Sequence, residues 1–191
     1  MRVVIAFVLS AVFLSSCTMP DTRIYSLSLP PVNEMAHGGG TASVNVLLRA
    51  PRYLDQPYIA YRISPYELEV SNASRWDSSP ADMVRRAIHD SLSFSGAFEA
   101  VTTSSLTPQG FYRCEINLRR FERFDKGPDS FGELDFQITF LSPKGEVLYH
   151  GSLSKEEKLA AGSFASLAKF LSEALSQGAE EAKAGILKSL P

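Results

Sequence analysis

One cysteine stands in a setting that predicts covalent chemistry. The N-terminal segment has a single early charge, Arg2, then an apolar run over residues 3–14, and closes with Leu14-Ser15-Ser16-Cys17. The run is too short for a transmembrane helix, which needs about 20 apolar residues, and is typical of a secretory signal peptide. An aliphatic residue, two small residues and a cysteine form the signature at which bacteria diacylate the thiol, cut the chain before it and acylate the new amine. We therefore predict a signal peptide over residues 1–16 and a lipidated Cys17. The alternative is an ordinary secretory signal that ends near a cysteine.

Acylation of Cys17 predicts a location. A single acyl chain binds membranes reversibly, and stable anchoring needs at least two; lipoproteins of this type carry three, palmitate among them. Thr18 follows the cysteine, whereas an aspartate at that position retains lipoproteins in the inner membrane of enteric bacteria. By resemblance to such lipoproteins, we expect the protein to be anchored on the periplasmic face of the outer membrane. Residues 17–22 form a tether of roughly 15–20 Å at most, so the folded part must lie close to its membrane.

Other chemistry in the sequence is weak. His37-Gly38-Gly39-Gly40 resembles the oxyanion-hole motif of some lipases, but the Gly-x-Ser-x-Gly elbow is missing, and a flexible turn is the simpler interpretation. The other histidines are isolated and no cluster has metal-ligand spacing, nor does a phosphate-binding glycine pattern occur. Exposed charges beside strands explain the carboxylate pairs Glu133/Asp135 and Glu156/Glu157 better than acid–base catalysis does. We predict a protein that is not an enzyme and that holds no cofactor or metal.

The charge composition argues against one class of partner, nucleic acid. The 191 residues carry 19 Lys and Arg against 21 Asp and Glu, with no basic patch along the sequence, which argues against nucleic acid as a partner. Residues 23–191 are one domain's worth of chain, long enough to bury a core. With Cys17 acylated, Cys114 has no disulfide partner; it falls on a strand pattern and is expected to be a small buried hydrophobe.

Periodicity predicts an α/β domain. Ser79, Pro80 and Asp82 form a helix start, and Gly96 ends that helix. Phe121 and Phe124 fall out of phase with the preceding alternation, which predicts a bulge or the end of a strand. The last three strands should form an antiparallel meander. Strands are predicted over residues 23–29, 42–49, 58–64, 66–71, 98–101, 112–119, 133–140 and 146–155, and helices over 80–95 and 163–190.

The middle of the chain carries a family resemblance. Its motifs are Arg49-Ala50-Pro51-Arg52-Tyr53-Leu54-Asp55-Gln56-Pro57, Tyr61-Arg62, Tyr66-Glu67-Leu68 and Arg75-Trp76. With the early Tyr25-Ser26-Leu27 and the cysteine signature, these motifs closely resemble the ABC-type transport auxiliary lipoproteins, a family that includes the lipoprotein of the paraquat-inducible system. The resemblance covers essentially the whole mature chain, although its C-terminal half is matched by pattern only.

The resemblance implies a fold and partners. The fold would be a three-layer α/β/α domain with a mixed, largely antiparallel sheet, similar to the anticodon-binding-domain class. The partners would be a periplasmic protein with MCE domains and its ABC permease and ATPase, in a system that moves lipids or other hydrophobic molecules between membranes. Two alternatives stay open, a lipoprotein subunit of another envelope assembly and a stand-alone hydrophobic-ligand-binding protein. The resemblance supplies no catalytic residues.

The loop over residues 51–57 is the candidate partner surface. It is polar, aromatic and bounded by prolines, which reduce the entropy lost when a loop is held in one shape. Tyrosine and arginine are enriched at binding hot spots. The loop would contact the MCE component or a second copy of the chain, or its Tyr53 and Leu54 would simply fill the core. The candidate partner-binding residues are Arg52, Tyr53, Asp55, Gln56 and Tyr58, and the motif residues expected to be structural are Arg49, Pro51, Leu54, Arg62, Arg75 and Trp76.

Overall fold

The computed structural model describes residues 21–30 and 40–191. Cys17 and the first three residues of the His-Gly-Gly-Gly segment lie outside this range. Within it, a long meander forms one side of the sheet: β6 (Tyr112–Lys126), β7 (Asp129–Leu141) and β8 (Val147–Lys158) pair antiparallel, as predicted. The β7–β8 turn closes with hydrogen bonds between Ser142 and Glu146 and between Gly145 and Ser142.

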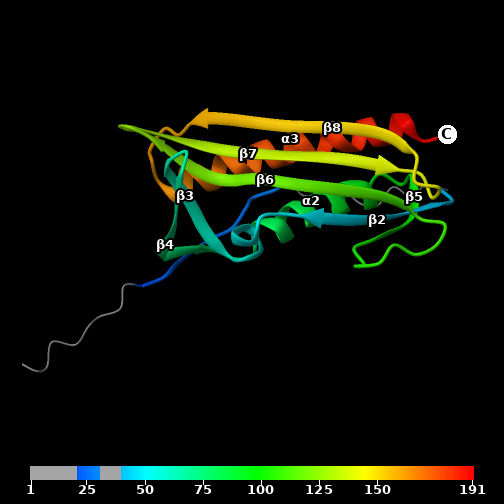
Figure 1. Ribbon diagram of the computed structural model, residues 1–191, viewed down its shortest axis with the longest axis horizontal. Coiled ribbons are helices and arrows are strands. Elements are labelled where there is room, and N and C mark those ends of the chain that lie inside the picture. Colours follow the sequence, from blue (N-terminus) through cyan, green and yellow to red (C-terminus); the bar gives the residue numbers. More distant parts are fainter. Residues whose placement is uncertain (1–20, 31–39) are drawn as a thin grey trace, which may run out of the picture.

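The other side of the sheet divides into two branches that both begin at β6, and the region where they separate is called the fork. The first half of β6 pairs in parallel with β2 (Ala42–Arg49), which pairs in turn with β5 (Phe98–Thr102). The second half of β6 pairs through Arg123 and Phe124 with β3 (Tyr58–Ser64), followed outward by β4 (Glu67–Trp76) and β1 (Arg23–Tyr25). Between the two branches lies the short 3-10 helix η2 (Arg52–Asp55). One edge of β6 therefore serves two separate branches, and η2 sits at their junction (Figure 1).

The meander strands run longer than predicted, with β6 extending to Lys126, β7 beginning at Asp129 and β8 ending at Lys158, and β1 and β4 also depart from the prediction. β1 ends at Tyr25 instead of residue 29, because its partner β4 ends at Trp76 and turns into a helix; the amide of Ser28 instead donates to the hydroxyl of Ser172. β4 continues five residues beyond the predicted end at residue 71. Its last residue, Trp76, is held by a bond from its amide to the carbonyl of Pro57 and by pairing with β1.

Helix α2 (Pro80–Ser93) begins where its sequence predicts. The Ser79 hydroxyl accepts the amide of Asp82 at 3.1 Å, and Pro80 occupies the first turn, where a missing N–H costs nothing. After the last turn, Gly96 adopts a positive φ of 69°, a conformation that favours glycine. The buried stripe of Met83, Val84, Ala87, Ile88 and Leu92 faces the sheet.

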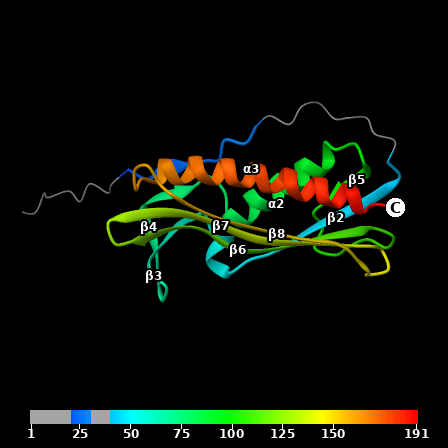
Figure 2. The ribbon, with the colours of Figure 1, turned by 90° about the horizontal axis from the view of Figure 1, so that it is seen from above.

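Both helices cover the same face of the sheet. α3 (Phe164–Ser189) lies over β7 and β8, and α2 lies beside it over β2 and β5 (Figure 2). The predicted single α/β domain with a mixed sheet is confirmed, and the long β6–β7–β8 ladders make its pairing largely antiparallel. The described elements form two layers, where the resemblance implied three. The opposite face of the sheet carries polar side chains at alternate positions, so no third layer is needed to cover it.

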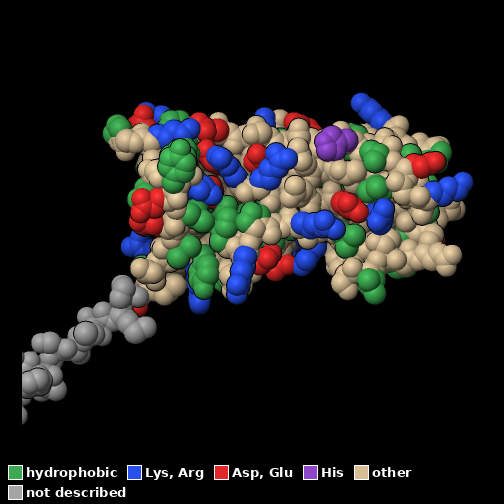
Figure 3. Space-filling view, viewed as in Figure 1, with side chains coloured by type: hydrophobic (Ala, Val, Ile, Leu, Met, Phe, Trp, Pro, Cys, Tyr) green, Lys and Arg blue, Asp and Glu red, His purple; other side chains and the backbone are tan. Residues whose placement is uncertain are grey.

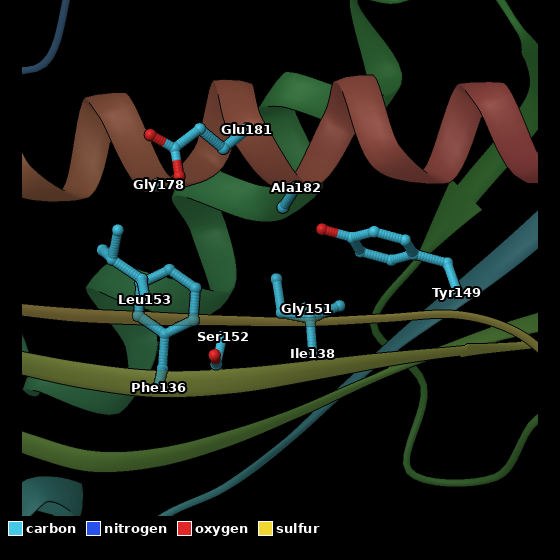
Figure 4. Close-up of a pocket in the computed structure, with 9 residues that line it drawn as sticks. All are labelled: Phe136, Ile138, Tyr149, Gly151, Ser152, Leu153, Gly178, Glu181 and Ala182. Carbon is cyan, nitrogen blue, oxygen red and sulfur yellow. The ribbon is translucent and has the colours of Figure 1, made fainter.

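Glycines let α3 approach the sheet closely. A Cβ at Gly178 would lie 2.6 Å from Cδ2 of Leu153 and 2.8 Å from Cζ of Phe136. Figure 4 shows these side chains reaching up from the strands beneath the helix, with Tyr149 beside them. The hollow left at this place is about 20 Å³, enough for roughly one water molecule. The layers are therefore closely packed here, and Gly178 is one reason for it.

Candidate docking site

The site is built around a bulge in β6. The β6–β7 register shifts between Leu118 and Arg120, as the phase change at Phe121 predicted. Beyond the shift Phe121 faces the helices, fully buried, and the next residue, Glu122, faces the opposite side of the sheet. A carboxylate on the helix-free face would ordinarily be solvated, yet Glu122 is 0% exposed. Burial of a charge is costly unless it is paired and hydrogen-bonded.

Two elements of the fork supply the partners of Glu122. The hydroxyl of Tyr53, on η2, donates to Oε2 at 2.7 Å, and Nε of Arg62, on β3, donates to Oε1 at 2.5 Å. The pKa of Tyr53 is raised, first by burial and then by the Glu122 charge, so the phenol stays a neutral donor. The Tyr53–Glu122–Arg62 network thus ties η2 and β3 to the central strand.

A shallow hollow opens over this network. It has a volume of about 570 Å³ and is lined by Arg52, Tyr53, Gln56, Tyr58 and Val70. Tyr58 and Val70 are 46% and 38% exposed, respectively. In Figure 3 hydrophobic side chains gather on this half of the sheet face with Lys, Arg, Asp and Glu between them. The hollow is a surface with apolar area and a polar rim, which is the anatomy of a protein-binding patch.

The structure brings together most of the predicted partner-binding residues. Arg52, Tyr53, Gln56 and Tyr58 all line the hollow, while Asp55 is exposed on η2 beside it. The sequence left open whether Tyr53 and Leu54 fill the core. Leu54 is fully buried in it, and the hydroxyl of Tyr53 is committed to Glu122.

The residues expected to be structural divide into two groups. Trp76 and Arg62 are placed as expected: Trp76 is 1% exposed, edge-on to Phe121 with ring centroids 5.5 Å apart, and Arg62 is paired with Glu122. Arg49, Pro51 and Arg75 are exposed instead. Arg49 lines a second hollow further along the same sheet face. The side chains of these three residues are not part of the core, although the carbonyl of Pro51 accepts the amide of Leu54 and Arg75 pairs within the sheet, and their structural role stays a prediction.

Two members of the site were missed from the sequence. Val70 looked like an ordinary member of its alternating strand, and Glu122 lay beyond the predicted end of its strand at residue 119. Val70 enters the hollow because it pairs with Ala60 across the hairpin. The one sequence feature that pointed to Glu122 was the break in alternation at Phe121, which indicates a bulge. Bulges often redirect side chains near functional sites.

Glu122 begins a row of three glutamates across neighbouring strands. Its cross-strand partner is Glu133 on β7, whose own partner on β8 is Glu156. Arg120 pairs with Glu133 at 2.5 Å and Lys126 with Glu156 at 2.8 Å. Burial raises the pKa of Glu133 despite the Arg120 guanidinium, whereas the Lys126 ammonium lowers the pKa of the exposed Glu156. The sequence prediction that Glu133 is simply an exposed charge is wrong, because it is 4% exposed.

This row predicts a pH dependence that a variant can reveal. A carboxyl with a raised folded pKa stabilises the fold only when protonated, so its contribution is complete below its unfolded pKa, near 4.5, and is lost as the pH rises through the folded pKa. Glu133→Gln mimics the protonated form. We expect its melting temperature to exceed the parent's by a few degrees at pH 7 and to match it near pH 4.

Glu156→Gln is the control for that comparison. Its carboxyl has a lowered pKa, so its contribution is present above the unfolded pKa and lost as the pH falls. This variant should therefore be no more stable than the parent at pH 7. Thermal unfolding followed by circular dichroism at both pH values makes the measurement. A Glu133→Gln variant less stable than the parent at pH 7 would show that the Arg120 pair outweighs the burial of the carboxylate.

The described residues offer little beyond this surface. Residues 21–30 and 40–191 contain no group of three His, Cys, Asp or Glu side chains placed to hold a metal ion. No helix in that range is both long and apolar enough to cross a membrane. Cys114 is fully buried on β6, and burial raises its thiol pKa to about 12. The expectation of a small buried hydrophobe at this position is confirmed.

Fold and surface together define the class: a two-layer α/β domain whose open sheet face carries a hollow held by a buried ion pair. The family follows from the sequence. The chain belongs to the ABC-type transport auxiliary lipoprotein component family, whose model matches residues 25–182. The resemblance inferred from the motifs is thereby confirmed. No curated protein matches the sequence.

Solved structures share the fold. A Xanthomonas campestris protein of the DUF330 family superposes with a TM-score of 0.72 at 22% identity, over 87% of this chain and 95% of that one. The structure of an uncharacterized protein gives a TM-score of 0.66 at 16% identity, over 87% and 99%. At these identities the likeness shows a common fold, and it covers nearly the whole of both neighbours.

Proposed function

We propose that this chain is a lipoprotein held by acylated Cys17 on the periplasmic face of the outer membrane. There it acts as a non-catalytic auxiliary component of an ABC transport system with an MCE-domain periplasmic protein, which moves lipids or other hydrophobic molecules. Family membership supports a transport-system partner. The observation that carries the docking role is the hollow of Arg52, Tyr53, Gln56, Tyr58 and Val70 over the Tyr53–Glu122–Arg62 network.

The geometry favours docking over carrying a lipid. A pocket for a small molecule typically has 300–1,000 Å³ and encloses most of its ligand. The hollow between α3 and the sheet has only about 20 Å³, too little for an acyl chain. The larger hollows, about 360 Å³ beside Arg49 and about 570 Å³ at the fork, lie on the helix-free face of the sheet and are open to solvent. A tether of roughly 20 Å also keeps the domain near its membrane, so the MCE component must reach it. A stand-alone hydrophobic-ligand carrier therefore finds less support.

The anchor has its own test. Mass spectrometry of the protein extracted from membranes should show a mature N-terminus at Cys17 that carries acyl chains. The Cys17→Ala variant should lose its firm attachment to the outer membrane, because that attachment rests on the acyl chains and no helix among residues 21–30 and 40–191 is long and apolar enough to cross a membrane. Recovery of Cys17→Ala in the outer membrane as firmly as the parent would contradict acylation as the means of attachment.

The docking role is tested by crosslinking in intact cells. A photoreactive amino acid at Arg52 or Gln56, both exposed on the hollow, should form adducts with the MCE protein or with a second copy of the chain. The same amino acid at Glu173, exposed on α3 on the other side of the sheet, is the matched control and should form none. Adducts from Glu173 alone, in a folded protein, would move the interface to the helical face.

A further inference from the structure

The turn between β3 and β4 presents large apolar side chains to solvent. Tyr66 is 97% exposed and Ile63 is 43% exposed, and Pro65 between them is exposed as well. Neither Ile63 nor Tyr66 belongs to the core cluster. Figure 2 shows the β3–β4 hairpin projecting from the helix-free side of the sheet. This turn is a protruding apolar tip with no role in the domain's own packing.

The tip lies at the end of the domain where the tether is attached. In Figures 1 and 2 the described chain begins at the same end as the hairpin, while the β7–β8 turn and the C-terminus lie at the opposite end. β1 runs parallel to β4, with Arg23 opposite Ser74. The N-terminal end of β1 therefore points the same way as the N-terminal end of β4, where the β3–β4 turn lies. Cys17 is six residues before Arg23, a reach of about 20 Å. β4 is bulged between Val70 and Arg75, so the turn lies less than seven extended residues from Ser74.

We propose that Ile63, Pro65 and Tyr66 contact the interfacial region of the membrane that holds the acyl anchor, a proposal that rests on the acylation of Cys17. Tyrosine is favoured at the headgroup level, where its ring is in an apolar layer and its hydroxyl in a wet one. Glu67 and Glu69 follow the turn on β4, so attraction to anionic lipid does not drive the contact. Zwitterionic phospholipids, which carry no net charge, suffice for it.

The contact would give the domain a second attachment. A tether alone leaves the domain free to rotate about its anchor. An apolar tip in the interface restricts that rotation and turns the end with the β7–β8 turn and the C-terminus away from the membrane (Figure 1). The domain would then present a fixed orientation to a partner that approaches from the periplasm.

Two matched serines allow a direct test. The hydroxyl of Ser64 accepts the amide of Tyr66 at 3.3 Å in the proposed tip, and that of Ser142 accepts the amide of Glu146 at 3.2 Å in the β7–β8 turn. Each is changed to cysteine in the full-length acylated chain and labelled with an environment-sensitive fluorophore. Cys114 does not react, because it is 0% exposed. The proteins are reconstituted into phosphatidylcholine and phosphatidylethanolamine vesicles with or without brominated lipid.

We expect the label at position 64 to emit at shorter wavelength and to lose emission with brominated lipid, while the label at position 142 does neither. The loss should disappear when Ile63→Ser and Tyr66→Ser are added. A label at position 64 that senses no lipid, in protein that floats with the vesicles, overturns the tip contact and leaves the anchor standing. Equal quenching with and without Ile63→Ser and Tyr66→Ser assigns the proximity to the tether alone and also overturns the tip contact. Protein that does not float overturns both anchor and tip.

Discussion

Replacing Trp76 by alanine should lower the melting temperature by about 10 °C, from a loss of about 3–5 kcal/mol in the free energy of unfolding. The side chain is 1% exposed and packs edge-on against Phe121. It lies where the end of β4 meets β1 and the start of α2. Removing the indole leaves a cavity among elements that are fixed by strand pairing and cannot collapse into it. Thermal and urea unfolding followed by circular dichroism measure the loss, because the variant has no other tryptophan to report by fluorescence.

Two variants separate packing from other effects of the change. Trp76→Phe keeps an aromatic ring and removes the indole N–H, which has no hydrogen-bond partner, so it should cost much less than alanine. Arg75→Ala changes the exposed neighbour and should shift the free energy of unfolding by less than about 0.5 kcal/mol. If Trp76→Ala melts like the parent and loses adducts with the partner, the residue is a contact and not a core residue.

Glu122→Ala should destabilise the domain by about 3 kcal/mol. The change leaves the Arg62 guanidinium, whose side chain is 21% exposed, without its carboxylate, and it leaves the hydroxyl of Tyr53 without its acceptor. Breaking a buried pair costs more than the pair's net contribution, because the remaining charge stays desolvated. The same variant should release η2 and β3 from the central strand and reduce crosslinking from Arg52 and Gln56.

A double-mutant cycle isolates the network. Tyr53→Phe removes one hydrogen bond to the carboxylate and should cost about 1 kcal/mol. Glu122→Gln keeps the shape and an acceptor oxygen and should cost less than alanine. If Tyr53→Phe and Glu122→Ala act through one network, the double variant will lose less stability than the sum of the two single variants. Strict additivity would mean that Tyr53 and Glu122 do not stabilise one another.

Most of the elements could be predicted because their signals are local. The cap of α2 is formed by Ser79 and Asp82, three residues apart, and the meander follows from alternation and the Ser142–Gly145 turn. Strand ends were harder to predict. The ends of β1 and β4 depend on how the two strands pair and on the hydrogen bond from the Trp76 amide to the Pro57 carbonyl. The periodicity of one strand cannot predict such contacts with a neighbouring strand.

The candidate site was likewise predictable only in part. Proline spacing and tyrosines at 53 and 58 marked the loop, and four of its five candidate residues do line one hollow. The role of Tyr53 could not be resolved from composition, since a tyrosine suits a partner surface and a half-buried position equally well. Its place was settled by Glu122, which lies 69 residues away along the chain.

The sequence by itself determined the acylation signature, the capped helix, the strands of the meander and the family resemblance, because each depends on residues close together in the chain. Only the tertiary structure decided that β6 serves two branches, that both helices lie on one face, and that Glu122 is buried on the other. Continued alternation from Tyr112 to Leu118 would place Glu122 on the apolar face, and the bulge after Leu118 turns it to the other face. Its burial depends on Tyr53 and Arg62, which strand pairing brings to it from 69 and 60 residues away, and no local pattern records which distant segments will meet.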